Sequence, residues 1–204
     1  VFENGFVSIL KGTWKIRVMK VSEIPITYGG KALHNIMNTL PSILATYLFK
    51  DVAIDDIKTA LATFVPSPTQ TPGRLNLFDF KNFKFLVDFA HNPAGLELLC
   101  DFVSKMEGTP KVGIISGTGD RRDEDIRELG VISGKCFDEI IIRQDKNLRG
   151  RTAEEIVNLL VEGINSSKTR DIPIKIIYNE KEAINFAYNT AIPGSLVTIM
   201  CDVV

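Results

Sequence analysis

The chain has 204 residues and a formal net charge of −1, with 45% hydrophobic and 24% charged residues, which is ordinary for a globular protein of one or two domains. A charge so close to zero argues against a nucleic-acid partner, which requires a basic excess. No apolar run approaches the roughly 20 residues of a membrane-spanning helix, so we expect no membrane association. Three cysteines and two histidines, widely spaced, form neither a disulfide framework nor a metal site, and we expect a cytoplasmic location.

The first 64 residues read as a small α+β unit. Phe6–Leu10 and Trp14–Val21 flank a Lys-Gly turn and predict a β-hairpin. Apolar residues at intervals of three and four predict an amphipathic helix from Leu33 to Leu48, and Pro41 inside it should kink the helix or mark a tight contact. A shorter helix is expected at Ile54–Phe64.

A stiff connector follows at residues 65–73, where three prolines fix the backbone and remove hydrogen-bond donors. We place the domain boundary in it, with a first domain at 1–70 and a second at 71–204.

The second domain alternates short apolar strands with helices. This order indicates an α/β fold with a doubly wound, Rossmann-like, mostly parallel sheet flanked by helices. Leu75–Phe80 should add an edge strand. The other expected strands are Phe85–Asp88, Val112–Ser116, Glu139–Ile142, Ile174–Tyr178 and Leu196–Cys201. The expected helices are Ala94–Met106, Asp125–Phe137, Ala153–Ser166 and Lys181–Thr190.

Unusual polar residues gather just after three of these strands, at Asp88–Pro93, Ser116–Asp123 and Arg143–Arg151. Ligands of open parallel sheets bind beyond the carboxyl ends of the strands. The sequence therefore predicts a binding site at this edge.

Each candidate residue also has a purely structural interpretation. Asp88 suits ribose hydroxyls and His91 suits phosphate, but Asn92 and Pro93 could simply cap a helix. Arg74 could bind phosphate or be a solvated linker residue.

The loop after the second parallel strand also has two interpretations. Gly117–Arg122 could form a backbone anion nest, although it matches no dinucleotide-binding or phosphate-loop pattern. Asp123, Glu124 and Asp125 could favour a helix start or receive a cationic substrate. Leu148–Arg151 alone would be taken as a surface turn.

In the first domain, Asn35 and Asn38 share one face of the expected helix, next to His34. Their amides could recognise the edge of an adenine base or belong to the polar start of a helix.

Taken in chain order, four of these segments resemble the landmarks of the Mur ligase superfamily, which contains the peptidoglycan ligases and folylpolyglutamate synthetase. They are His34–Asn38, Pro72–Arg74, Asp88–Pro93 and Gly117–Arg122. Three further strings resemble most the branch that joins arginine to the side-chain carboxylates of a polyaspartate chain, namely Thr71–Asp79, Gly119–Asp125 and Leu148–Arg151.

The resemblance implies a remnant of an α+β, ATP-binding central domain followed by a carboxyl-terminal domain. It implies a ligase that phosphorylates a carboxylate with ATP and lets an amino acid displace phosphate from the acyl phosphate. The implied cofactor is ATP with Mg, whose ligands lie mainly outside this chain. The implied partners are an amino acid, with arginine suspected, an acidic polypeptide acceptor and the missing N-terminal domains of the same protein, while a homo-oligomer is left open.

By motif match, Arg74 and His91 are the implied catalytic residues at the phosphates. Asn35 and Asn38 would approach adenine, and Asp88 the ribose. The residues implied to meet the substrate are Asp120, Arg121, Arg122, Asp123, Glu124, Asp125, Asp145, Arg149 and Arg151.

The sequence departs from the superfamily in two respects. It contains no Gly-x-x-x-x-Gly-Lys-Ser/Thr segment, so we expect a fragment that is inactive alone. Glu154-Glu155 stands where the superfamily tends to have Gly-Glu, which weakens the roles assigned to the preceding loop. A ligase for a diamino acid or glutamate, and a non-catalytic nucleotide-binding or scaffold domain, remain alternatives.

Overall fold

The computed structural model describes residues 1–49, 51–144, 146–167 and 169–201. It divides into two compact units, Val1–Pro66 (unit 1) and Ser67–Val204 (unit 2). The division falls at the proline-rich connector. The assignment of the units to domains of a larger ligase stays a prediction.

Unit 1 is a three-stranded antiparallel sheet with two helices. The sheet has the order β1-β2-β3 and contains the predicted hairpin, together with a two-residue strand that the sequence pattern does not predict. The elements are β1 (Phe2–Glu3), β2 (Phe6–Lys11), β3 (Trp14–Lys20), two 3₁₀ turns at Val21–Glu23 and Pro25–Thr27, α1 (Leu33–Tyr47) and α2 (Ile54–Thr63).

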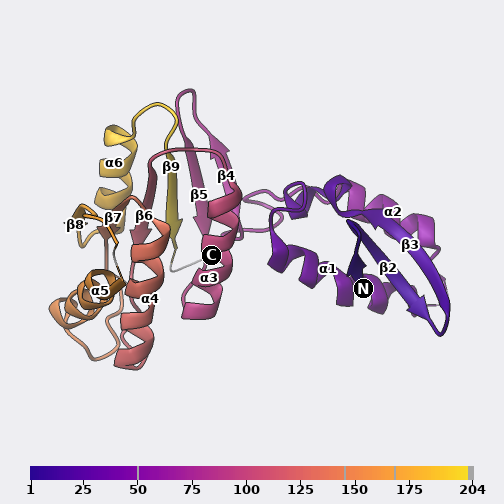
Figure 1. Ribbon diagram of the computed structural model, residues 1–204, viewed down its shortest axis with the longest axis horizontal. Coiled ribbons are helices and arrows are strands. Elements are labelled where there is room, and N and C mark those ends of the chain that lie inside the picture. Colours follow the sequence, from indigo (N-terminus) through magenta and orange to yellow (C-terminus); the bar gives the residue numbers. More distant parts are fainter. Residues whose placement is uncertain (50, 145, 168, 202–204) are drawn as a thin grey trace. The chain divides into compact units, whose positions relative to one another are not determined.

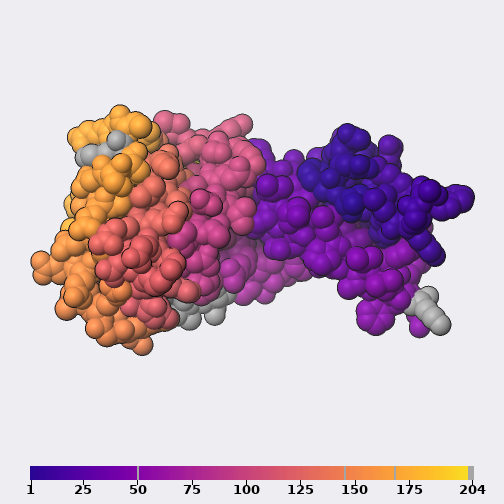
Figure 2. All heavy atoms as spheres, turned by 60° about the horizontal axis from the view of Figure 1, so that its bottom comes forward, coloured from indigo at the N-terminus to yellow at the C-terminus, as the bar shows by residue number. Residues whose placement is uncertain are grey.

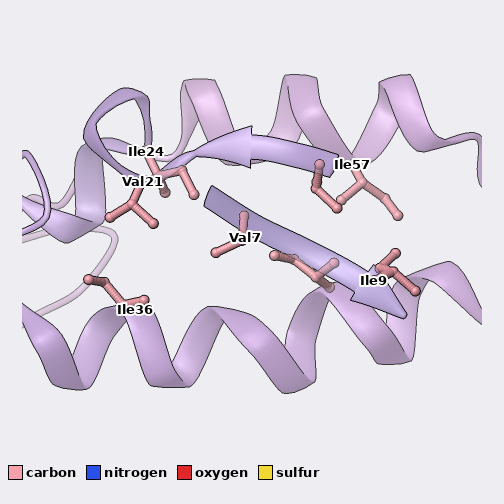
Figure 3. Packing of buried hydrophobic residues seen from close by; sticks show 8 residues of the cluster. Val7, Ile9, Val21, Ile24, Ile36 and Ile57 are labelled. Atoms are coloured by element: carbon pink, nitrogen blue, oxygen red, sulfur yellow. The ribbon is translucent and has the colours of Figure 1, made fainter. Parts of the chain in front are cut away.

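The core of unit 1 lies between the hairpin and the helices. Figure 3 shows Val7 and Ile9 of β2 with Ile36 of α1 and Ile57 of α2 around one apolar centre. The sole tryptophan, Trp14, begins β3 at the hairpin turn and is 78% exposed, so it takes no part in this core.

Unit 2 contains a six-stranded sheet of order β4-β5-β9-β6-β7-β8, in which β4 is antiparallel to β5 and the remaining pairs are parallel. The strands are β4 (Asn76–Asp79), β5 (Lys84–Asp88), β6 (Lys111–Ile115), β7 (Glu139–Ile142), β8 (Ile174–Ile176) and β9 (Leu196–Met200). The helices are α3 (Pro93–Lys105), α4 (Asp123–Cys136), α5 (Ala153–Ser167) and α6 (Glu180–Thr190). The predicted α/β class, the parallel sheet and its edge strand are confirmed.

The strand order explains the position of each helix. From β5 to β8 the chain advances across the sheet in one direction, and α6 then leads back to β9 between β5 and β6. Crossovers between parallel strands are right-handed, so a connection that reverses direction must cross the opposite face. Helices α3, α4 and α5 accordingly pack side by side on one face, whereas α6 covers the core residues of the other (Figure 1).

Glycines allow α4 and α5 to approach very closely. A Cβ at Gly163 would lie 2.0 Å from the carbonyl oxygen of Arg127, and one at Gly130 would lie 2.2 Å from that of Leu160. The atoms of the two helices adjoin in the space-filling view (Figure 2). This contact holds together the helices that follow β6 and β7, and with them the two loops that precede these helices.

Candidate active site

A cavity of about 630 Å³ lies at the carboxyl ends of the parallel strands, within unit 2. Its wall is formed by residues that follow five of the strands. They are 89–91 after β5, 116 and 118 after β6, 144, 146, 147 and 149 after β7, 178–181 after β8, and 200–201 at the end of β9. Figure 1 shows the arrowheads of β5, β6 and β9 at this edge. The volume is in the range of small-molecule sites, and the cavity lies where the sequence predicted a binding site.

The cavity wall is predominantly basic. Arg121, Lys146, Arg149 and Lys181 contribute four cationic side chains. Glu180 is the single carboxylate among the lining residues that the structure describes. Such a wall favours ligands that carry at least one anionic group.

Three polar atoms of this wall are buried without a hydrogen-bond partner among the described residues. They are Thr118 Oγ1, Arg121 Nε and Gln144 Oε1. A buried polar group without a partner costs about 1–3 kcal/mol, and a ligand that supplied the missing bond would remove this cost. The cavity wall therefore has unused hydrogen-bonding capacity on the loops after β6 and β7.

Arg74 and His91 come together around the ring of Phe89, which follows Asp88 in the chain. The Arg74 guanidinium carbon lies 5.0 Å from the Phe89 ring centroid, and the His91 ring centroid lies 4.7 Å from it. His91 Nδ1 is also 3.0 Å from the carbonyl oxygen of Phe89. Phe89 did not feature among the predicted site residues, yet it contacts both predicted cations.

Asp88 has a structural bond in addition to any ligand role. The backbone N–H of Leu75 donates to Asp88 Oδ2 at 2.9 Å and thereby ties the Arg74 segment to the end of β5. Burial raises the pKa of Asp88 above its usual value, while the Leu75 hydrogen bond and the charge of Arg74 oppose the rise.

The buried Asn76 shapes the turn that carries Arg74. Its Oδ1 accepts from the Gly73 N–H at 2.7 Å, and its Nδ2 donates to the Thr71 carbonyl oxygen at 2.9 Å. The turn also needs positive φ angles, 61° at Gly73 and 48° at Leu75. The sequence pattern also gave Asn76 no role at the site, because it places this residue only near the start of an edge strand.

Residues 92 and 93 fit the capping interpretation. Asn92 Oδ1 accepts from the Gly95 N–H at 2.8 Å, and Pro93 occupies the first turn of α3. His91, in contrast, lines the cavity.

The acids at the start of α4 are largely committed to arginines of the same chain. Asp123 pairs with Arg151 at 2.7 Å, and Asp125 accepts from both Nε and a terminal nitrogen of Arg122, at 3.0 and 2.7 Å. The hydrogen bond from Arg122 lowers the pKa of Asp125. Glu124 is exposed on the same turn.

None of these three acids lines the large cavity, and Asp125 instead borders a separate depression with Glu97, Glu128 and Arg121. Helix α4 begins two residues earlier than expected, at Asp123, so the acids occupy the first turn, where they also stabilise the helix.

The two loops after β6 and β7 are bonded to each other. Arg151 donates to the carbonyl oxygens of Gly119 and Arg121, at 3.0 and 2.9 Å. Arg149 pairs with Asp120 and lines the cavity. A Cβ at Gly119 would lie 1.9 Å from the Leu148 carbonyl oxygen, so this close approach requires glycine. Arg151 thus bonds to neighbouring residues away from the cavity, whereas Arg149, paired with Asp120, also lines the cavity.

A family model described as Mur ligase, glutamate ligase domain, matches residues 73–202. The chain belongs to the Mur ligase family. It is 40% identical over 200 residues to the cyanophycin synthetase of Nostoc sp., a match that covers 98% of this chain and 22% of that protein. It is 29% identical over 189 residues to a UDP-N-acetylmuramoyl-L-alanyl-D-glutamate–2,6-diaminopimelate ligase of Clostridium perfringens, covering 91% of this chain and 36% of that protein.

Solved structures show the same fold. The bifunctional folylpolyglutamate synthase/dihydrofolate synthase of Yersinia pestis superposes with a TM-score of 0.64 at 16% identity, over 94% of this chain and 40% of that one. The Mycobacterium tuberculosis folylpolyglutamate synthase complexed with ADP and AMPPCP gives 0.55 at 20% identity, over 74% and 33%. The chain spans about a fifth of the length of the cyanophycin synthetases that it matches. These synthetases are the branch of the superfamily that Thr71–Asp79, Gly119–Asp125 and Leu148–Arg151 resemble.

The remaining predicted residues lie elsewhere. Asn35 and Asn38 are on α1 of unit 1, where Asn35 Nδ2 donates to the Ile26 carbonyl oxygen at 2.8 Å and Asn38 is exposed. Asp145 lies outside the described residues.

Within the described ranges no cluster of three or more His, Cys, Asp or Glu could hold a metal, and no helix is long and apolar enough to cross a membrane.

Proposed function

We propose that this chain is part of an ATP-dependent ligase that joins an amino acid to a carboxylate, and that the cavity binds the incoming amino acid. The observation that carries the proposal is the set of three unsatisfied polar atoms in a basic cavity at the carboxyl edge of the sheet. An α-carboxylate supplies both the negative charge and the acceptor that Arg121 lacks. Thr118 Oγ1 can donate to the same carboxylate.

Arginine is the amino acid that we propose, and an acidic polypeptide is the acceptor. The support is the 40% identity to cyanophycin synthetases along nearly the whole chain. In the proposed reaction the acceptor carboxylate is activated as an acyl phosphate, and the amine of arginine displaces phosphate. A diaminopimelate ligase is the second candidate, supported by the 29% identity to the Clostridium perfringens protein.

The residues present fit an ATP phosphate chain in part. Arg74 and His91 both contact the ring of Phe89, and Phe89 and His91 line the cavity, so the two residues would hold phosphate and stabilise its charge during transfer. Asp88 would reach the ribose, and Asn35 and Asn38 the adenine. We assign most Mg ligands, and the phosphate loop, to parts of the enzyme beyond these residues.

Binding of amino acids by the 204-residue chain tests the proposal. Titration with L-arginine, meso-diaminopimelate and L-glutamate, followed by calorimetry or NMR shifts, should show saturable binding that is tightest for arginine. Tighter binding of diaminopimelate would favour the second candidate. Binding of none of the three would leave the scaffold alternative and overturn the proposal.

Arg74 and His91 can be tested in a Nostoc cyanophycin synthetase in which this chain replaces the matching segment. We expect Arg74→Ala and His91→Ala to lower arginine-dependent turnover about ten- to a hundredfold, as for the loss of a charged hydrogen bond. The thermal midpoint should change little. Unchanged turnover would assign both residues to structural roles, and Arg170→Ala, at an exposed ion pair, serves as the control.

A further inference from the structure

The acidic residue of the cavity lies on a different element from the predicted acids. Glu180 is in the first turn of α6, after β8, and it lines the cavity, whereas Asp123 and Asp125 do not. Its side chain is 36% exposed, so it is accessible to a ligand.

Glu180 is held in place by a buried arginine. Arg143, at the end of β7, is 0% exposed, and its Nε lies 3.3 Å from Glu180 Oε2. Arg143 also donates to the carbonyl oxygens of Met200 and Gln144. Carbonyl oxygens at the ends of β7 and β9 thus hold the Arg143 guanidinium in place, and the guanidinium in turn positions the Glu180 carboxylate.

The Glu180 carboxylate can accept further hydrogen bonds in addition to its contact with Arg143. A carboxylate can accept about four hydrogen bonds, and the contact with Arg143 Nε involves one oxygen. Gln144 lines the same cavity, is 8% exposed, and donates through Nε2 to the Ala153 carbonyl oxygen at 3.0 Å. Its Oε1 has no partner among the described residues, so this wall has an unused acceptor for an N–H donor.

We propose that Glu180, with Gln144 beside it, receives the positively charged side chain of the amino acid substrate and so determines specificity for a basic amino acid. This inference rests on the proposed function and refines it. The loops after β6 and β7 carry Arg121 and Arg149 for the α-carboxylate, while the first turn of α6 carries the acid for the other end. A guanidinium and a carboxylate match in planar, two-bond geometry.

The test compares L-arginine with L-citrulline, in which a neutral urea group replaces the guanidinium, on the 204-residue chain. Calorimetric or NMR titration of the unaltered protein should show arginine binding about tenfold more tightly than citrulline, as for a charged hydrogen bond at a partly exposed site. Glu180→Gln should reduce this ratio to about one to two and leave citrulline binding nearly unchanged. Glu182→Gln, which removes the same charge two residues along α6 and outside the cavity wall, should preserve the ratio.

Two other results would overturn the inference alone and leave the proposed function standing. If Glu180→Gln keeps the tenfold ratio while Asp123→Asn loses it, the acids of α4 recognise the substrate. If Glu180→Gln weakens both ligands equally, Glu180 only supports Arg143. If the unaltered protein binds neither ligand, the proposed function fails, and the inference with it.

Discussion

The two faces of the unit 2 sheet are built in different ways. On one face, α4 and α5 meet backbone to backbone at Gly130 and Gly163, and the ring of Phe137 occupies the space beside Gly113. On the other, α6 is the helix that packs on the sheet, through the small side chains of Ala183 and Ala187. The helices of the first face follow the loops that carry Arg121 and Arg149, and the second face supplies Glu180 together with Lys181. The charged groups of the cavity therefore depend on separately packed elements.

The largest expected effect lies at the α4–α5 contact. Gly163→Ala places a Cβ 2.0 Å from the Arg127 carbonyl oxygen, and only a backbone shift can relieve this overlap. We expect the free energy of unfolding to fall by about 3 kcal/mol. Urea unfolding followed by circular dichroism measures the change.

Gly95→Ala is the matched control on the same face. Its Cβ would meet Asn92 Oδ1 at 3.3 Å and no backbone atom closer than 3.7 Å, and alanine favours the helix, so the change should stay within about 1 kcal/mol. Equal losses at Gly95 and Gly163 would contradict the view that α4 and α5 form a uniquely tight contact on this face.

A smaller effect is expected where the two faces meet. Arg143→Met leaves the carbonyl oxygen of Met200 without its donor and Glu180 without its buried cation. Since Glu180 is partly exposed, we expect a loss of about 2 kcal/mol rather than the full cost of breaking a buried pair. Arg127→Met, which breaks an exposed pair with Glu162, should cost less than about 1 kcal/mol in the same assay. A larger loss at Arg127 would contradict this order.

The smallest effect concerns Asp88 and depends on pH. Burial raises its pKa in the folded state, so the folded protein binds this proton more tightly than the unfolded chain does. The contribution of Asp88 to stability is therefore greatest below its unfolded pKa of about 3.9 and declines as pH rises towards the folded value.

Asp88→Asn should remove this decline, because the amide oxygen can still accept from Leu75. The variant should gain stability relative to the unaltered protein as pH rises above about 4. Urea unfolding at several pH values between about 4 and 7 would show it, and parallel pH profiles for the two proteins would refute the assignment.

Much of unit 2 could be predicted from sequence because its strands are short apolar runs and its helices are periodic. The bounds of β7 match the prediction, and the other strands differ by one or two residues at an end. Strand β1 was missed because two residues at the chain start carry no periodicity, and only pairing with β2 defines it. Glu180 was missed for a related reason, and Gln144 was placed at the predicted binding edge without a role of its own.

Glu180 lies in a polar run that reads as an ordinary solvated helix start, and only the return of the chain from β8 to β9 places this helix start at the cavity. Gln144 lies in the segment after β7 that the sequence placed at the binding edge, but nothing in the local pattern distinguishes it from its polar neighbours. His91, Arg121 and Arg149 could be placed at the cavity because each follows a strand end, though their roles stay predictions. Arg151 lies two residues after Arg149 and was predicted to meet the substrate as well. Its hydrogen bonds to the carbonyl oxygens of Gly119 and Arg121 are a tertiary contact that residue spacing alone does not reveal.

The exposure of Trp14 has a practical consequence for spectroscopy. An indole that is 78% exposed already emits in a water-like environment, so its fluorescence should shift little when the protein unfolds. It also belongs to unit 1, whereas the cavity belongs to unit 2. The same indole is the natural optical probe for anything that covers the β2–β3 turn, where a blue shift or protection from acrylamide quenching would report contact at that single position.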